Sequence, residues 1–369
     1  MRAAVCRAYG APETIVVDPD FALPAIGPGQ VRVRVGAAAV NFPDVLLMAN
    51  KYQVSVPVPF VPGSEFAGLV DAVGAGVTGL APGDRVMGTS ITGAFAEQAV
   101  VPARSLTHVP DGVADAPAAA FGVAHRTAYH VLRSVAAVQP GEKLIVLGAG
   151  GGVGLAAVQL GVILGATVIA VASSEAKLAV AASYGAAALI NHLTGDLRSA
   201  LRAAAPDGAD VVVDPVGGDL AEPALRTLRW GGRFVTVGYA SGTVPSIPLN
   251  LVLLKGCRVL GFQFRSFAAN EPEQSRRNEA DLLALLAAGR TAPHVGATFP
   301  LAEASAALRH VADGKAIGKV VLEIGLPAGP AGKPSAALPP WRLASRGKKR
   351  SIRSSLRSAL GRLRERRAG

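Results

Sequence analysis

The residues best suited to chemistry are five glycines near the start of a long uncharged run. Residues 144–174 contain no charged side chain, and glycine occupies positions 148, 150, 151, 152 and 154. Glycines between a strand and a helix permit a tight turn, let the backbone approach a pyrophosphate, and place the phosphates at the helix N-terminus. The pattern therefore predicts a dinucleotide-binding turn made of Gly148, Gly151, Gly152, Val153 and Gly154.

The same run could also be a membrane span, because a transmembrane helix needs about 20 continuous apolar residues. However, the glycine cluster would weaken a helix at its start. The β-rich stretches LIVLG before the glycines and TVIAVAS further on divide the run into strand, turn, helix and strand. A buried parallel strand and its crossover helix need no charge, so we expect a nucleotide-binding unit.

The residue types at the end of the second strand indicate whether the cofactor is NAD or its 2′-phosphorylated form, NADP. Enzymes for NAD usually carry Asp or Glu there, about 20 residues after the glycines, to hold the ribose hydroxyls. This chain has Ala172, Ser173 and Ser174, and Lys177 follows. Hydroxyl groups and a lysine suit a 2′-phosphate, so we expect NADPH. The alternative for Lys177 is an ordinary exposed lysine on a helix.

Two sequence patterns, one in each part of the chain, predict the elements that position these residues. The first 120 residues contain β-branched runs separated by Gly and Pro, typical of an antiparallel, barrel-like module. From about residue 141, six short apolar runs alternate with helix-compatible segments, which predicts a doubly wound parallel sheet of six strands in an α/β protein. A helical piece, NEADLLALLAAG, and a closing strand, GKVVLEI, follow.

Charge is distributed unevenly along the chain. Residues 1–325 carry 25 Lys/Arg and 25 Asp/Glu, whereas residues 326–369 carry 12 basic residues and one Glu. The tail therefore holds the whole net charge of +11. We expect a disordered basic tail with three possible roles: a solvated segment, a peripheral contact to an anionic membrane through Ile352, Leu356, Leu360 and Leu363, or, least favoured, binding to nucleic acid.

Cysteine and histidine usage excludes several classes. The two cysteines, Cys6 and Cys257, form no CxxC, and no HExxH or GxSxG motif occurs, so disulfide frameworks, zincin-type sites and serine hydrolases are not expected. The N-terminus lacks the apolar region of a signal peptide. We expect a cytoplasmic enzyme, with membrane-peripheral attachment through the tail as an alternative.

Taken together, these motifs resemble the zinc-free quinone oxidoreductase family of the medium-chain dehydrogenase/reductase superfamily. The resemblance covers residues 1 to about 325 and rests on NFPD at 41–44, PFVPGSEFAG at 59–68, GDRVMG at 83–88, GAFAEQAVVP at 93–102, TAYH at 127–130, GAGGGVGLAAVQL at 148–160, DPVGG at 214–218 and GKVVL at 318–322. It implies a GroES-like catalytic domain at 1–124 and 266–325, a Rossmann domain at 125–265, and a homodimer.

The resemblance also bears on zinc. Alcohol dehydrogenases of this superfamily have Cys where this chain has Asn41, and Gly-His-Glu where it has Gly63, Ser64 and Glu65. A catalytic zinc needs three protein ligands and an open position. We therefore expect no metal, and an acceptor that is already electron-poor.

By resemblance, Asn41, Asp44 and Tyr52 lie near the nicotinamide. Asn41 would donate to a substrate carbonyl, and Tyr52 would deliver a proton to the resulting oxyanion or enolate. The alternatives are that Asp44 braces a helix and that Tyr52 is merely an aromatic residue of a loop.

The resemblance implies further cofactor contacts from Thr127, Tyr129 and Gly238. His192 stands where family members often have a tyrosine; if it lies by the 2′-phosphate, its protonation would strengthen NADPH binding at lower pH.

Three functions follow as hypotheses. The leading one is an NADPH-dependent quinone oxidoreductase that also accepts electron-poor conjugated carbonyls. The second is an NADPH-dependent 2-enoyl thioester reductase that uses the same residues. The third is an NADPH-binding protein attached to RNA or an anionic membrane by its basic tail.

Overall fold

The computed structural model describes residues 1–325. The basic tail predicted at 326–369 lies outside the described residues, and so do the roles proposed for it. No helix within residues 1–325 combines the length and the apolar character that a membrane crossing requires. The uncharged run at 144–174 instead forms a strand, a glycine turn, a helix and a second strand, as predicted.

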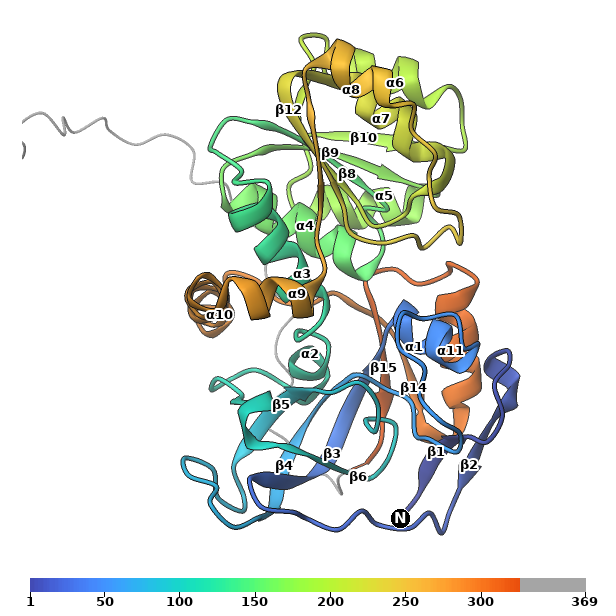
Figure 1. Ribbon diagram of the computed structural model, residues 1–369, viewed down its shortest axis with the longest axis vertical. Coiled ribbons are helices and arrows are strands. Elements are labelled where there is room, and N and C mark those ends of the chain that lie inside the picture. Colours follow the sequence, from blue (N-terminus) through green and yellow to red (C-terminus); the bar gives the residue numbers. More distant parts are fainter. Residues whose placement is uncertain (326–369) are drawn as a thin grey trace, which may run out of the picture. The chain divides into compact units, whose positions relative to one another are not determined.

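A six-stranded parallel sheet forms the first of two larger sheets (Figure 1). Its strand order is β10-β9-β8-β11-β12-β13, and each neighbouring pair is parallel. The strands are β8 (Lys143–Leu147), β9 (Thr167–Ala172), β10 (Ala188–Asn191), β11 (Ala209–Asp214), β12 (Leu228–Thr236) and β13 (Arg258–Gly261). The predicted doubly wound α/β sheet is confirmed.

Helices cover both faces of this sheet because successive strand side chains point to opposite sides. In β8, Leu144 and Val146 join one apolar cluster, while Ile145 and Leu147 join another. The first cluster is completed by α4 and α5, and the second by α6 and α7. The helices that follow the strands are α4 (Gly152–Ile163), α5 (Glu175–Ser183), α6 (Leu197–Ala204), α7 (Ala221–Thr227) and α8 (Leu249–Lys255).

The second large sheet is mainly antiparallel, as predicted for the β-rich N-terminal region. Its order is β14-β15-β3-β4-β5-β7, with β6 paired to β3. Among the strand pairs described in this sheet, only β14 and β15 run parallel. The strands are β3 (Gln30–Val40), β4 (Glu65–Val73), β5 (Arg85–Thr89), β6 (Gln98–Pro102), β7 (Leu106–His108), β14 (Val295–Pro300) and β15 (Lys319–Glu323), and a separate hairpin pairs β1 (Ala3–Cys6) with β2 (Ile15–Asp18).

Several helices accompany this second sheet or lie between the two sheets (Figure 1). They are α1 (Phe42–Met48), α2 (Asp115–Ala119), α3 (Ala124–His130), α9 (Phe264–Asn270), α10 (Pro272–Ala287) and α11 (Ala304–Ala312). Helix α10 packs on α3, where Glu279 accepts one hydrogen bond from Arg126 and contacts His130. The segment predicted to rejoin the catalytic domain from residue 266 first pairs with its sheet at β14.

Candidate functional site

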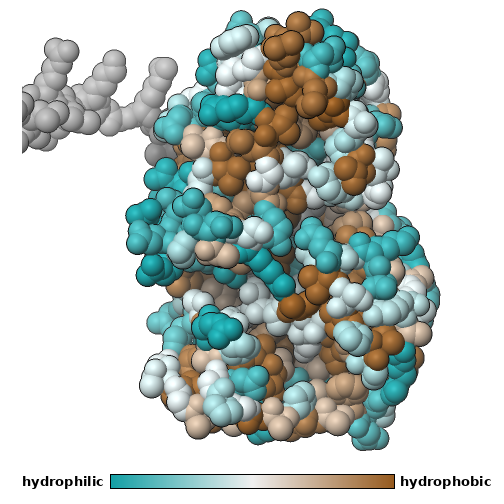
Figure 2. Space-filling model, in the orientation of Figure 1, coloured by the Kyte–Doolittle hydropathy of each residue, from teal (hydrophilic) through white to brown (hydrophobic). Residues whose placement is uncertain are grey.

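A cleft of about 1760 Å³ collects most of the residues singled out in the sequence. Its walls come from both sheets: the glycine turn after β8 and the end of β9 on one side, and α1, the end of β5 and the start of β15 on the other. Figure 2 shows that the surface is hollowed between these two parts of the molecule. A cleft at the carboxyl ends of parallel strands is the usual ligand position in such folds.

The glycine turn is shaped for a close backbone approach. Gly148 has φ of +61°, which favours glycine, and a Cβ on Gly154 would lie 2.0 Å from the Gly148 carbonyl oxygen. A Cβ on Gly151, by contrast, would meet only that oxygen, at 3.5 Å. Helix α4 begins at Gly152 and directs its free amide groups toward the cleft. This cradle fits a pyrophosphate.

The end of β9 brings together Ser173, Lys177 and His192, which all line the cleft. The Lys177 ammonium donates to the Gly314 carbonyl at 2.6 Å and lies 3.2 Å from the Ser173 hydroxyl. Burial lowers the pKa of Lys177. Burial, together with the nearby Lys177 charge, also lowers the pKa of His192. Consequently, His192 stays neutral to lower pH in the ligand-free protein than an exposed histidine does.

Ser174 differs from the expectation that it contacts the cofactor. Its side chain caps the N-terminus of α5 by accepting the Lys177 backbone amide at 3.3 Å, and it is not among the residues that line the cleft. The hydroxyl is therefore used in starting the helix, which is a common role for serine at this position.

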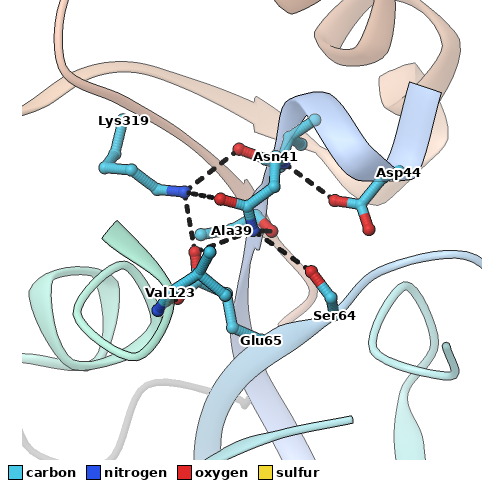
Figure 3. A network of polar contacts seen from close by, with 8 residues as sticks. Ala39, Asn41, Asp44, Ser64, Glu65, Val123 and Lys319 are labelled. Carbon is cyan, nitrogen blue, oxygen red and sulfur yellow. Dashed lines mark hydrogen bonds and ion pairs between the residues drawn. The ribbon is translucent and has the colours of Figure 1, made fainter. Parts of the chain in front are cut away.

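A buried lysine organises the floor of the cleft (Figure 3). Lys319, the first residue of β15, directs its ammonium to Glu65 Oε1 at 2.7 Å, to Asn41 Oδ1 at 2.5 Å and to the Val40 carbonyl at 3.2 Å. The side chains of Lys319 and Glu65 are 4% and 0% exposed. The second oxygen of Glu65 accepts the Val123 amide at 2.7 Å, so this carboxylate connects β4, β15 and the start of α3.

The network also fixes the orientation of the Asn41 amide. Lysine can only donate and an ionised carboxylate can only accept, so Oδ1 faces Lys319, and Nδ2 donates to Glu65 at 2.9 Å and to Ser64 at 3.2 Å. The amide was expected to donate to a substrate carbonyl. In the structure its protons already have protein acceptors.

Asp44 has the place that the structural alternative predicted. It is the third residue of α1, is fully buried, and accepts the Asn41 backbone amide at 2.7 Å, which braces the start of the helix. Burial raises its pKa to about 7, and its other oxygen has no hydrogen-bond partner within residues 1–325. Asp44 is not among the residues lining the cleft.

The remaining predicted site residues fall into two groups, those that line the cleft and one that lies in the apolar core. Tyr52, Thr127 and Gly238 line the cleft. Tyr129, expected to approach the nicotinamide, is instead 5% exposed and belongs to the apolar core beneath α3. On an α-helix, residues two positions apart point in different directions, so Thr127 and Tyr129 could not both face the cleft.

Sequence reasoning missed Lys319 and Arg126. The available signal was a lysine at the start of the strand KVVLE, directly before three apolar residues, where burial calls for a partner. Arg126 lines the cleft and lies over the Phe264 ring, 4.5 Å from its centroid.

Comparisons with known proteins agree with this architecture. Residues 27–111 match the model of the alcohol dehydrogenase GroES-like domain, and residues 152–284 match that of the zinc-binding dehydrogenase domain. Quinone oxidoreductase-like protein 2 of Bos taurus is 36% identical over 325 residues, which cover 88% of this chain and 92% of the bovine protein.

Solved structures are similar as well. The quinone oxidoreductase of Thermus thermophilus is 34% identical with a TM-score of 0.77, and the match covers 88% of this chain and 100% of that one. The Escherichia coli quinone oxidoreductase, solved with NADPH, is 27% identical with a TM-score of 0.82 over the same shares.

A GroES-like domain joined to a Rossmann-type sheet, with a glycine-rich turn lining the cleft between them, defines an oxidoreductase of the medium-chain dehydrogenase/reductase superfamily. Within that superfamily, the chain belongs to the quinone oxidoreductase family.

Proposed function

We propose that this protein is a zinc-independent NADPH:quinone oxidoreductase that also reduces other electron-poor conjugated carbonyls. The observation that carries the proposal is the buried Lys319 ammonium, which lies between Asn41 and Glu65 where zinc-dependent relatives of the superfamily would hold a metal.

The cofactor is NADPH. The solved E. coli and T. thermophilus quinone oxidoreductases include NADPH complexes. In this chain β9 ends without a carboxylate, and Lys177 and Ser173 line the cleft beside it. The pyrophosphate fits the turn at Gly151 and the N-terminus of α4, and the 2′-phosphate fits Lys177, which would exchange its contact with the Gly314 carbonyl for the phosphate.

NADPH, when bound, supplies a hydride. The side chains around the acceptor then have two tasks: to orient the carbonyl and to provide the proton that completes the reduction. Tyr52 is half-buried, lines the cleft and carries a hydroxyl group, so we assign it the proton transfer to the oxyanion or enolate. Thr127 lines the cleft from the α3 side and offers a second hydroxyl for orientation.

Zinc does not fit this site. Within residues 1–325 no group of three or more His, Cys, Asp or Glu side chains is arranged to hold a metal. A divalent ion between Asn41 and Glu65 would also face the Lys319 ammonium, which already occupies the carboxylate. The fixed positive charge of a lysine replaces that of a metal, but without an open coordination position for an alcohol.

The test is NADPH oxidation by 1,4-benzoquinone, with NADH as the alternative donor and with Tyr52→Phe as the variant. We expect NADPH to be strongly preferred, and the variant to lose about 100-fold in kcat, the contribution typical of one general acid, while its Kd for NADPH is unchanged. Absence of quinone turnover, or equal use of NADH, contradicts the proposal.

A homodimer is part of the proposal, supported by an apolar surface beside a free sheet edge. Among residues 1–325, strand β13 pairs only with β12, and near it Trp230, Leu249, Leu253 and Leu254 are each more than 70% exposed. Figure 2 shows this brown patch over α8. Open strand edges and large apolar patches favour association, and a second copy would cover both.

Light scattering tests the dimer. Leu253→Glu is expected to give a monomer, whereas Leu193→Glu, which changes a residue that is 69% exposed outside the patch, is expected to leave the mass unchanged. A wild-type monomer at micromolar concentration contradicts the assignment.

A further inference from the structure

The cleft is lined by far more positive than negative charge. Among the described residues, six Lys or Arg side chains line it, against a single carboxylate, Asp313. Two of the cations, Lys177 and Lys319, belong to the 2′-phosphate end and to the floor network described above. Lys51, Arg104, Arg126 and Arg265 remain unexplained.

These four residues belong to segments outside the glycine turn, and three of those segments meet at the end of β5 or at Phe264. Lys51 directly precedes Tyr52, the proposed proton donor. Arg126 donates to the Thr89 hydroxyl at 3.2 Å, at the end of β5, and lies over Phe264; Arg265 is the next residue of α9.

The segment that carries Arg104 also reaches β5. Arg104 lies in the short 3₁₀ turn Ala103–Ser105, and a Cβ on Gly88 would come within 3.2 Å of the Ser105 carbonyl oxygen. Gly88 immediately precedes Thr89 in β5, so the turn that carries Arg104 lies at the end of the strand that Arg126 contacts.

In the part of the chain that the structure describes, only one of the four cations has a carboxylate partner. Arg126 pairs with Glu279 at 2.7 Å. Within residues 1–325, the ion pairs leave Lys51, Arg104 and Arg265 without a carboxylate partner. Arg104 and Arg265 are exposed, so both side chains remain accessible to a ligand. A cleft lined by one sign of charge concentrates ligands of the opposite sign.

We propose that the natural acceptor carries an anionic group attached to its electron-poor carbonyl, and that Arg104 and Arg265 recognise this group at the mouth of the cleft. The inference rests on the proposed function and narrows its substrate class. A sulfonated or carboxylated quinone and the phosphates of a coenzyme A thioester share this chemistry, so both are included in the test.

The experiment compares matched acceptors that differ in charge: 1,4-naphthoquinone with its 2-sulfonate, and crotonyl-N-acetylcysteamine with crotonyl-CoA. We expect Arg104→Gln and Arg265→Gln each to lower kcat/KM for the charged member of a pair by about three- to tenfold. The kcat/KM for the neutral member of each pair and the Kd for NADPH are expected to stay unchanged. Arg276→Gln, which removes an exposed charge on α10 outside the cleft, is the matched control.

Binding is measured alongside turnover, by the fluorescence of bound NADPH titrated with unreactive butyryl-CoA and butyryl-N-acetylcysteamine. A preference for the charged ligand that weakens in both variants supports the inference, even if turnover fails and the proposed function falls. Equal binding and equal kcat/KM for charged and neutral members, in wild type and variants alike, overturns it. If the variants weaken the response only to the sulfonated quinone, the natural acceptor is an anionic quinone. If they weaken the response only to the coenzyme A compounds, it is a coenzyme A thioester.

Discussion

Removing one partner of the buried ion pair Lys319–Glu65 is expected to lower the free energy of unfolding far more than removing one partner of an exposed pair with the same N···O distance. Both pairs, Lys319–Glu65 and Arg2–Glu97, have N···O distances of 2.7 Å, but the side chains are 4% and 0% exposed in the first and 57% and 32% exposed in the second. Removing one partner of a buried pair costs about 3–5 kcal/mol because the other charge remains without compensation. Exposed pairs contribute about 0–1 kcal/mol.

The variants are Lys319→Met, Glu65→Gln and the double substitution, with Arg2→Met as the exposed control. Each single substitution in the buried pair is expected to lower the melting temperature of the protein by about 6–10 °C. The double variant should be less destabilised than the sum of the two by about 2–3 kcal/mol, since it leaves neither charge alone. Additive losses in the double variant, or a loss for Arg2→Met equal to that for Lys319→Met, would refute this reasoning.

Three other predictions concern the cofactor end and the start of α1. Lys177→Ala should raise the Kd for NADPH by about 10–100-fold through loss of a charge-assisted contact, with no change for NADH; an equal change for both cofactors in a titration contradicts the 2′-phosphate role. Gly154→Ala should disrupt the turn and lower both stability and NADPH affinity, whereas Gly151→Ala should preserve the melting temperature because its Cβ has space; equal melting temperatures for both variants contradict this. Burial raises the pKa of Asp44 to about 7 in the folded chain, compared with about 4 in the unfolded chain. Its contribution to the free energy of unfolding is therefore fully present below about pH 4 and is lost as the pH rises through about 7. The loss amounts to about 1.4 kcal/mol for each pKa unit between the two states. Asp44→Asn should flatten the dependence of the melting temperature on pH in this range, and an unchanged slope would exclude Asp44 as its source.

Local patterns made much of the fold and the cofactor end predictable. The glycine turn, its flanking strands and the missing carboxylate after β9 all lie within about 35 consecutive residues, where periodicity and glycine spacing carry the information. The same holds for the alternation that predicted the parallel sheet.

Long-range contacts account for what was missed. Lys319 meets Asn41 across 278 residues of chain and Glu65 across 254, and no local pattern reports such a meeting. Ser174 was assigned to the cofactor because serine suits both phosphate binding and helix capping, and only the geometry of α5 separates the two. Tyr129 was misplaced because the direction of helix α3 relative to the cleft was not available from the sequence.

The most direct test of the central claim is quinone reduction by protein freed of metal. The protein is dialysed against a chelator, its metal content is measured, and NADPH oxidation by 1,4-benzoquinone is recorded before and after addition of zinc. With Lys319 holding Glu65 and Asn41, full activity is expected in the metal-free protein and no gain from zinc. Activity that disappears with the metal and returns with zinc would contradict the account.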